Sequence, residues 1–191
     1  MTATPRYQKT QRREFFAHHM LLHAADLQIQ EAAGELKSRF NRCLAAMVMT
    51  SLSTEALANA VGSRTVNDWT PVERLNPLEK LNRLVQDLKI DRDANKEPWS
   101  TLGYLSGFRN DIAHPKPELI EEQQYLPQHA LDKKLFDAPL SMLEREISIG
   151  NARRCLKAVQ DLKGILVDAM PAEERFGMYT DMWPGNTGLP E

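Results

Sequence analysis

The stretch from Arg109 to His114 brings an arginine, an amide, a carboxylate and a histidine together within six residues. Arginine presents a fixed fork of donors that matches the oxygens of a phosphate group. Histidine titrates near neutral pH, so it can take or give a proton. Together these residue types could bind a phosphate group and transfer protons beside it.

The spacing of the same stretch predicts how a helix would present it. Arg109 continues the apolar stripe begun by Leu102 and Leu105, whereas Asn110 and His114 are four residues apart and share an adjacent face. The proline that follows disfavours helical geometry at His114, so we predict that the helix ends there. A histidine at a helix C-terminus meets the negative end of the dipole, which favours its protonated form.

A long helix predicted at residues 35–61 carries a carboxylate in line with its apolar residues. The apolar stripe of this helix consists of Phe40, Leu44, Met47, Val48 and Leu52. The same register continues through Glu55 and Asn59, and Gly62 is expected to follow the end of the helix. A core-facing carboxylate needs a cationic partner, and Arg109 lies on a comparable face. We therefore predict that Glu55 lies near Arg109.

Hydrophobic periodicity predicts an all-α protein with an up-and-down bundle of four to five helices. The predicted helices cover residues 9–30, 35–61, 77–88, 98–114 and 150–169, with one short turn at 141–146. Residues 1–171 are expected to form a single domain with a frayed start to about residue 8. Residues 172–191 are expected to form a C-terminal tail, either loose or docked through its aromatic side chains.

Composition limits the classes of function. The chain of 191 residues has a net charge of -2, so nucleic-acid binding would require a local basic patch. The candidates to line such a patch are Arg109, Lys116, Arg153 and Arg154. Cys43 and Cys155 lie within predicted helices and are expected to be reduced core residues of a cytoplasmic protein. No signal core and no apolar run long enough to span a bilayer is evident, so no membrane role is expected.

The first predicted helix contains residue types that bind metals. Glu14 and His18 are four apart, as are His19 and His23, and Asp26 follows. A di-iron bundle would need paired Glu-x-x-His units on two helices, and no such pair occurs. We therefore favour exposed or core-edge histidines over a metal site, and we expect no metal and no cofactor.

Arginine, a polar residue, three further residues and histidine near the end of a bundle helix resemble the signature of HEPN domains. The order of the helices, and Glu55 followed by Asn59 on the second helix, are also similar to that family. The resemblance covers roughly residues 9–170 and implies a HEPN-like bundle. Many members are metal-independent endoribonucleases, whereas others keep the fold without this activity.

The resemblance implies a homodimer in which the motifs of two protomers form one cleft. Arg109 and His114 of both chains would then be catalytic, Asn110 would orient the phosphate or the histidine, and Glu55 would hold Arg109. The expected products are a 2',3'-cyclic phosphate and a 5'-hydroxyl end. Such a protein would act on RNA as a toxin or in phage defence, with an antitoxin or another protein as a further partner.

Three other interpretations compete with the nuclease. A non-catalytic HEPN-like dimer would bind a nucleotide, an RNA or a protein. A purely structural role would have Arg109 neutralise Glu55 and His114 cap its helix. A helical adaptor would instead use residues 172–191 to dock a partner. The carboxylate of Asp111 would repel phosphate if it faced the same cleft as His114.

Overall fold

The computed structural model describes residues 9–11, 14–123, 125, 127, 138–180 and 185–187. The described residues form an all-α helical bundle, which confirms the predicted fold class. The α-helices are α1 (Ala17–Gly34), α2 (Arg39–Thr65), α3 (Pro77–Asp87), α4 (Trp99–Ala113), α6 (Met142–Glu146) and α7 (Ile149–Ala169). Two 3-10 turns, η1 (Val72–Arg74) and η2 (Ala172–Glu174), and two short strands, β1 (Lys9–Gln11) and β2 (Gly185–Thr187), complete the elements. The start predicted to be frayed lies outside the described residues.

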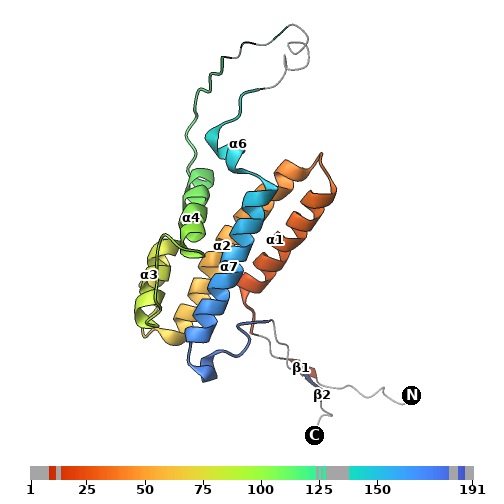
Figure 1. Cartoon of the computed structure of the whole chain (residues 1–191). Coiled ribbons are helices and arrows are strands. Elements are labelled where there is room, and N and C mark those ends of the chain that lie inside the picture. Colours follow the sequence, from red (N-terminus) through yellow and green to blue (C-terminus); the bar gives the residue numbers. More distant parts are fainter. Residues whose placement is uncertain are drawn as a thin grey trace, which may run out of the picture.

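Three long helices form the centre of the bundle. In Figure 1, α1, α2 and α7 run side by side, and α3 and α4 flank them on one side. Fully buried side chains from α2, α3, α4 and α7 fill the space between the helices, among them Met47, Leu57, Leu84, Leu105 and Leu162. The end of α4 and the docked C-terminal segment lie at opposite ends of this bundle (Figure 1).

The central helix α2 is long and apolar enough to cross a membrane by length and composition, because an 18-residue window within it has a mean hydropathy of 1.3. Half of that apolar window is buried inside the bundle. Its buried positions include Thr50, Ser53 and Thr54, whose hydroxyl groups donate to carbonyl oxygens of the same helix. The apolar character of α2 therefore matches its place as the helix around which the others pack.

Local sequence signals set the ends of the shorter helices. Asn76 and Glu79 form a capping box at the start of α3, with Pro77 at the first helical position as predicted. Helix α4 ends at Ala113, and the backbone N–H of His114 donates to Asn110 O at 2.9 Å, which confirms the predicted end. These ends follow from cap and proline chemistry within a few residues, so the sequence alone identifies them.

Four predicted helix boundaries are wrong. The first helix ends at Gly34 rather than at residue 30, and the second begins at Arg39 rather than at residue 35. The first helix begins at Ala17 rather than at residue 9, because Lys9–Gln11 pairs antiparallel with Gly185–Thr187. The second helix continues past Gly62 to Thr65. A side chain at Gly62 would meet the ring of Trp69 at 2.4 Å, so this glycine serves close packing of the indole rather than helix termination.

The buried face of α2 also differs from the predicted stripe. Phe40 and Leu52 are 43% and 44% exposed, whereas smaller residues of the same helix are fully buried. These smaller buried residues are Cys43, Ala46, Thr50, Ser53 and Ala58. Because α1 and α7 both pack against α2, short side chains allow the helix axes to approach closely. Hydrophobicity alone did not reveal this face.

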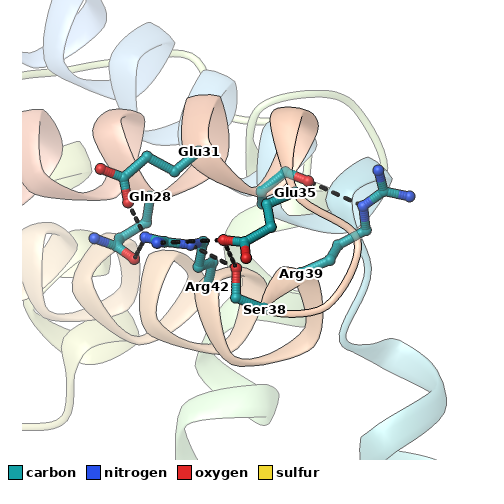
Figure 2. A network of polar contacts seen from close by, with 7 residues as sticks. Gln28, Glu31, Glu35, Ser38, Arg39 and Arg42 are labelled. Atoms are coloured by element: carbon teal, nitrogen blue, oxygen red, sulfur yellow. Dashed lines mark hydrogen bonds and ion pairs between the residues drawn. The ribbon is translucent and has the colours of Figure 1, made fainter.

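Arg42 stabilises the turn between α1 and α2, because side-chain oxygens from both sides of the turn accept from its guanidinium. Arg42 forms ion pairs with Glu31 and Glu35, and its Nε donates to Ser38 Oγ at 2.8 Å (Figure 2). Arg39 Nε donates to the carbonyl of the last turn of α1 at 2.9 Å. Polar contacts therefore stabilise the turn at residues 35–38 between the two helices.

The first part of the predicted tail, residues 172–180, is docked against the bundle. Arg64 donates to the carbonyl oxygens of Glu174 and Phe176 at 2.8 and 2.7 Å. Met178 is fully buried, whereas the side chain of Phe176 is 56% exposed. Gly177 has a φ of +75° and lies against the ring of Phe16, where a side chain would not fit. Backbone contacts, Met178 and the hydroxyl of Tyr179, which donates to Asp168 on α7, therefore dock this segment. Docking through an aromatic side chain thus applies to Tyr179, whereas Phe176 is mostly exposed and Trp183 lies outside the described residues.

Candidate functional site

Arg109 occupies the apolar side of α4 predicted from its spacing. Its side chain lines a gap of about 10 Å³ with Ser51 and Thr54 of α2 and Leu78 of α3. Such a gap holds about one water molecule. The guanidinium donates to Asn110 Oδ1 at 3.4 Å, a long hydrogen bond. The Arg109 side chain is thus half-buried, with its charged end beside an exposed amide.

Glu55, predicted to lie near Arg109 as its partner, forms no ion pair with it among the described residues. Glu55 Oε1 accepts instead from Lys80 Nζ of α3 at 2.5 Å. The Lys80 side chain is only 1% exposed, whereas that of Glu55 is 30% exposed. A buried ammonium requires a carboxylate, so Lys80 has the stronger need for this partner. Within the described part of the chain, no ion pair is found for Arg109.

Asn59 also has a different role from the one implied by the resemblance. Its Oδ1 accepts from Trp69 Nε1 at 3.4 Å, so it holds the connector between α2 and α3. Neither Glu55 nor Asn59 lines a hollow with His114. The two residues expected to support the site therefore stabilise the packing of α2 against neighbouring segments.

His114 is exposed at the C-terminal end of α4 and lines a hollow of about 410 Å³. Lys116 contributes a positive charge to the same hollow, as expected for a phosphate-binding surface. Asp111 and Glu118 line it as well, so its formal charge with a neutral histidine is negative. The condition under which Asp111 would repel phosphate is therefore met in a single chain.

Arg109 and His114 do not meet within one chain. Five helical positions separate them, which corresponds to about 140° around the helix axis. Arg109 lines the gap against α2 and α3, whereas His114 lines the hollow against α6. One protomer therefore presents the guanidinium and the imidazole on different sides of α4.

The two arginines of α7 expected to bind RNA are both exposed but differ in their contacts. The guanidinium of Arg154 lies 4.7 Å from the ring centroid of Tyr104 on α4. Tyr104 Oη donates to Glu146 Oε2 at 2.8 Å, and burial together with this carboxylate raises the pKa of the phenol. Arg153 lies beside Arg154 on α7 and has no contact of this kind among the described residues. The structure thus brings Lys116 to His114 and places Arg154 against Tyr104.

A second hollow, of about 300 Å³, adjoins the first and was not predicted. It is lined by Tyr104, Gly107, Phe108, Asp111, Met142, Leu143 and Glu146. Helix α6 supplies one wall, and a capping box between Ser141 and Glu144 starts this helix. The spacing of Ser141 and Glu144 predicts that a helix starts here, but it does not predict that this helix lies beside α4.

The histidine-rich first helix binds part of its own chain. His19 Nε2 donates to the carbonyl of Gly177 at 2.8 Å, and His18 is fully buried beside Met178. The described residues contain no group of three metal-binding side chains. Cys43 and Cys155 are buried free thiols, and burial raises the pKa of Cys155 to about 11. Both cysteines are thus core residues, as predicted.

Comparisons with models of known protein families, with curated proteins and with solved structures found no match. The likeness of residues 109–114 to HEPN domains therefore rests on the motif and on the order of the helices.

Proposed function

We propose that this protein is a metal-independent endoribonuclease of the HEPN type, active as a homodimer. Arg109 and His114 are its catalytic residues, and Asn110 orients the phosphate or the imidazole. The observation that carries the proposal is the state of Arg109, whose charge is not neutralised by Glu55. The structural interpretation of this arginine depended on that ion pair.

The cost of burying charge strengthens this argument. A half-buried guanidinium among Ser51, Thr54 and Leu78 loses part of its hydration. Its described hydrogen bond to Asn110 is long and restores little of that loss. A phosphate group at this position would supply two parallel hydrogen bonds and the missing negative charge. The exposed Asn110 beside it would keep such a ligand accessible to solvent.

The different directions of Arg109 and His114 support a site completed by a second copy. In the proposed reaction, His114 of one protomer takes the proton from the 2'-hydroxyl, which then attacks the adjacent phosphorus. The partner subunit's His114 gives a proton to the departing 5'-oxygen. Arg109 stabilises the charge on the non-bridging oxygens. One proton is thus removed from the 2'-hydroxyl and one is given to the 5'-oxygen, and neither transfer needs a metal or a cofactor.

A second candidate is a non-catalytic dimer that binds a nucleotide, an RNA or a protein, and one observation favours the form that binds a protein. Asp111 and Glu118 line the hollow that contains His114, and both repel a phosphate. Under the nuclease proposal, the RNA backbone therefore approaches from the Arg109 side of α4. A cytoplasmic role as a toxin or in phage defence belongs to the same proposal.

Purified protein incubated with single-stranded RNA in EDTA tests the proposal. We expect cleavage that leaves 2',3'-cyclic phosphate ends, and we expect His114→Ala and Arg109→Ala each to lower the rate at least about 100-fold. Asp111→Asn is the matched control on the same helix, and it should retain or increase cleavage. Absence of cleavage by the wild-type protein, with specific binding of RNA, would support the non-catalytic dimer instead.

A further inference from the structure

The two adjoining hollows beside α4 form one continuous depression, here called the α4–α6 groove. They share Asp111 of α4 with Met142 and Leu143 of α6. One end of the groove is formed by Tyr104 and the other by the segment after His114. In Figure 1, α6 lies close to the end of α4, at the start of α7. The groove is separate from the gap that Arg109 lines.

The floor of the α4–α6 groove is apolar and open. Phe108 is buried beneath it, Leu143 is half-buried, and the side chain of Met142 is 81% exposed. A side chain at Gly107 would meet no atom within 4 Å, so the floor is open at this position. Methionine adapts its shape readily and is favoured at surfaces that receive apolar side chains.

The wall at the Tyr104 end is held in place. Tyr104 donates to Glu146, and Arg154 covers the face of its ring. Asn151 Nδ2 donates to the backbone carbonyl of Glu146 at 2.8 Å, which ties the end of α6 to the start of α7. A wall fixed by three contacts lowers the entropy lost when a ligand binds.

The rim of the groove is acidic. Asp111, Glu118 and Glu146 line it, against one ammonium group from Lys116 and the imidazole of His114. Arg154 lines neither hollow, and its guanidinium lies over the Tyr104 ring. An occupant with positive charges around an apolar face would complement this rim, whereas a nucleic acid would be repelled.

We propose that the α4–α6 groove binds a basic amphipathic segment of a partner protein. Leucine-like side chains of that segment fill the floor over Phe108 and Gly107, and its lysines or arginines meet Asp111, Glu118 and Glu146. An amphipathic helix laid in an apolar groove is a common recognition mode. The inference holds whether or not the protein cleaves RNA. A segment bound there would cover His114 and so block any reaction that uses it.

A labelled peptide tests this assignment on the full chain by fluorescence anisotropy. The probe is a helical peptide of about 14 residues with leucine on one face and lysine on the other. A second probe carries glutamate in place of each lysine. We expect saturable binding of the lysine peptide, which weakens with salt, and no binding of the glutamate peptide.

Two glycines of α4 provide matched variants. Gly107→Leu fills the floor and should weaken binding of the lysine peptide at least about tenfold. Gly103→Leu adds the same side chain one helical turn away, outside the groove lining, and should leave binding unchanged. Glu118→Gln should weaken binding and reduce its dependence on salt.

Three outcomes would overturn the proposal. Equal binding of the two peptides would show that the groove does not select positive charge. Unchanged binding by Gly107→Leu, or equal loss in Gly103→Leu, would place the peptide elsewhere. The third outcome is measured by sedimentation velocity. If the wild-type protein is a dimer and Gly107→Leu is a monomer, the occupant of the groove is a second copy of this chain.

Discussion

The two ends of the bundle each carry arginine and histidine but use them in opposite ways. At the end that holds the C-terminal segment, Arg64 binds two carbonyl oxygens, forms an ion pair with Glu14 and covers the ring of Phe16. At the end of α4, Arg109 has one long hydrogen bond and His114 is exposed. The first end is completed by its own chain, whereas the second presents its charged groups to solvent.

This difference separates structural from functional arginines. The partners of Arg64 and those of Arg42 at the α1–α2 turn are supplied within the fold, as Figure 2 shows for Arg42. Arg109 has no equivalent set of acceptors among the described residues. Residue type is therefore a poor guide to role, because the local supply of acceptors decides whether a guanidinium is available to a ligand.

The largest expected effect on the free energy of unfolding tests which cation forms the ion pair with Glu55. Glu55→Ala leaves Lys80 buried without its carboxylate, so the free energy of unfolding should fall by about 3 kcal/mol. Lys80→Met keeps the aliphatic stem, removes the charge and should cost less, about 1 kcal/mol. Urea denaturation of the single and double variants measures the coupling between the two residues.

The same cycle made with Arg109 is the control. Glu55 and Arg109 should show no coupling beyond about 0.5 kcal/mol, the usual limit for independent sites. Coupling as strong as that of the Lys80 pair would restore the structural interpretation of Arg109.

The next effect compares the two ends directly. Arg64→Ala loses two hydrogen bonds from a charged donor, one to a half-buried carbonyl and one to an exposed carbonyl, so it should lower the free energy of unfolding by about 2 kcal/mol. Arg109→Ala should change it by less than about 0.5 kcal/mol, because its described contact is weak. Amide hydrogen exchange should show faster exchange at residues 172–180 in Arg64→Ala alone. Equal losses of stability in the two variants would remove the distinction between the ends.

The smallest effect concerns the open face of α4. Gly103→Ala and Gly107→Ala should each raise the free energy of unfolding by about 0.5–1 kcal/mol, since alanine favours a helix and meets no neighbour at either position. Thermal denaturation of the two variants checks this gain. A loss of stability at Gly107 would mean that the groove floor is closed in solution.

The sequence predicts features that depend on nearby residues and misses those that depend on distant ones. The start of α3 at Pro77 and the end of α4 before Pro115 follow from local chemistry and were predicted correctly. The three-residue strand Lys9–Gln11 was missed, because so short a strand shows no alternation and its partner lies near the other end of the chain. The continuation of α2 past Gly62 depends on Trp69, which periodicity does not place.

The candidate site shows the same limit. Periodicity correctly placed Arg109 on the packed side of α4 and correctly indicated that Glu55 needs a cation. It did not indicate which of several cations would be nearest. Lys80 lies four residues before Leu84, so the helical spacing points it inward, but its charge makes it an unusual core residue. The groove against α6 could not be predicted, because it depends on contact between two helices that lie far apart in the sequence.

The most direct test of the account is the rate of RNA cleavage in EDTA by Arg109→Ala and Arg64→Ala, measured side by side on folded protein. The account predicts that Arg109→Ala loses at least about 100-fold in rate with unchanged stability. Arg64→Ala should keep the wild-type rate at a temperature below its unfolding transition. Equal rates in the two variants, or no cleavage by the wild-type protein, would contradict the claim that the open end of the bundle is the catalytic one.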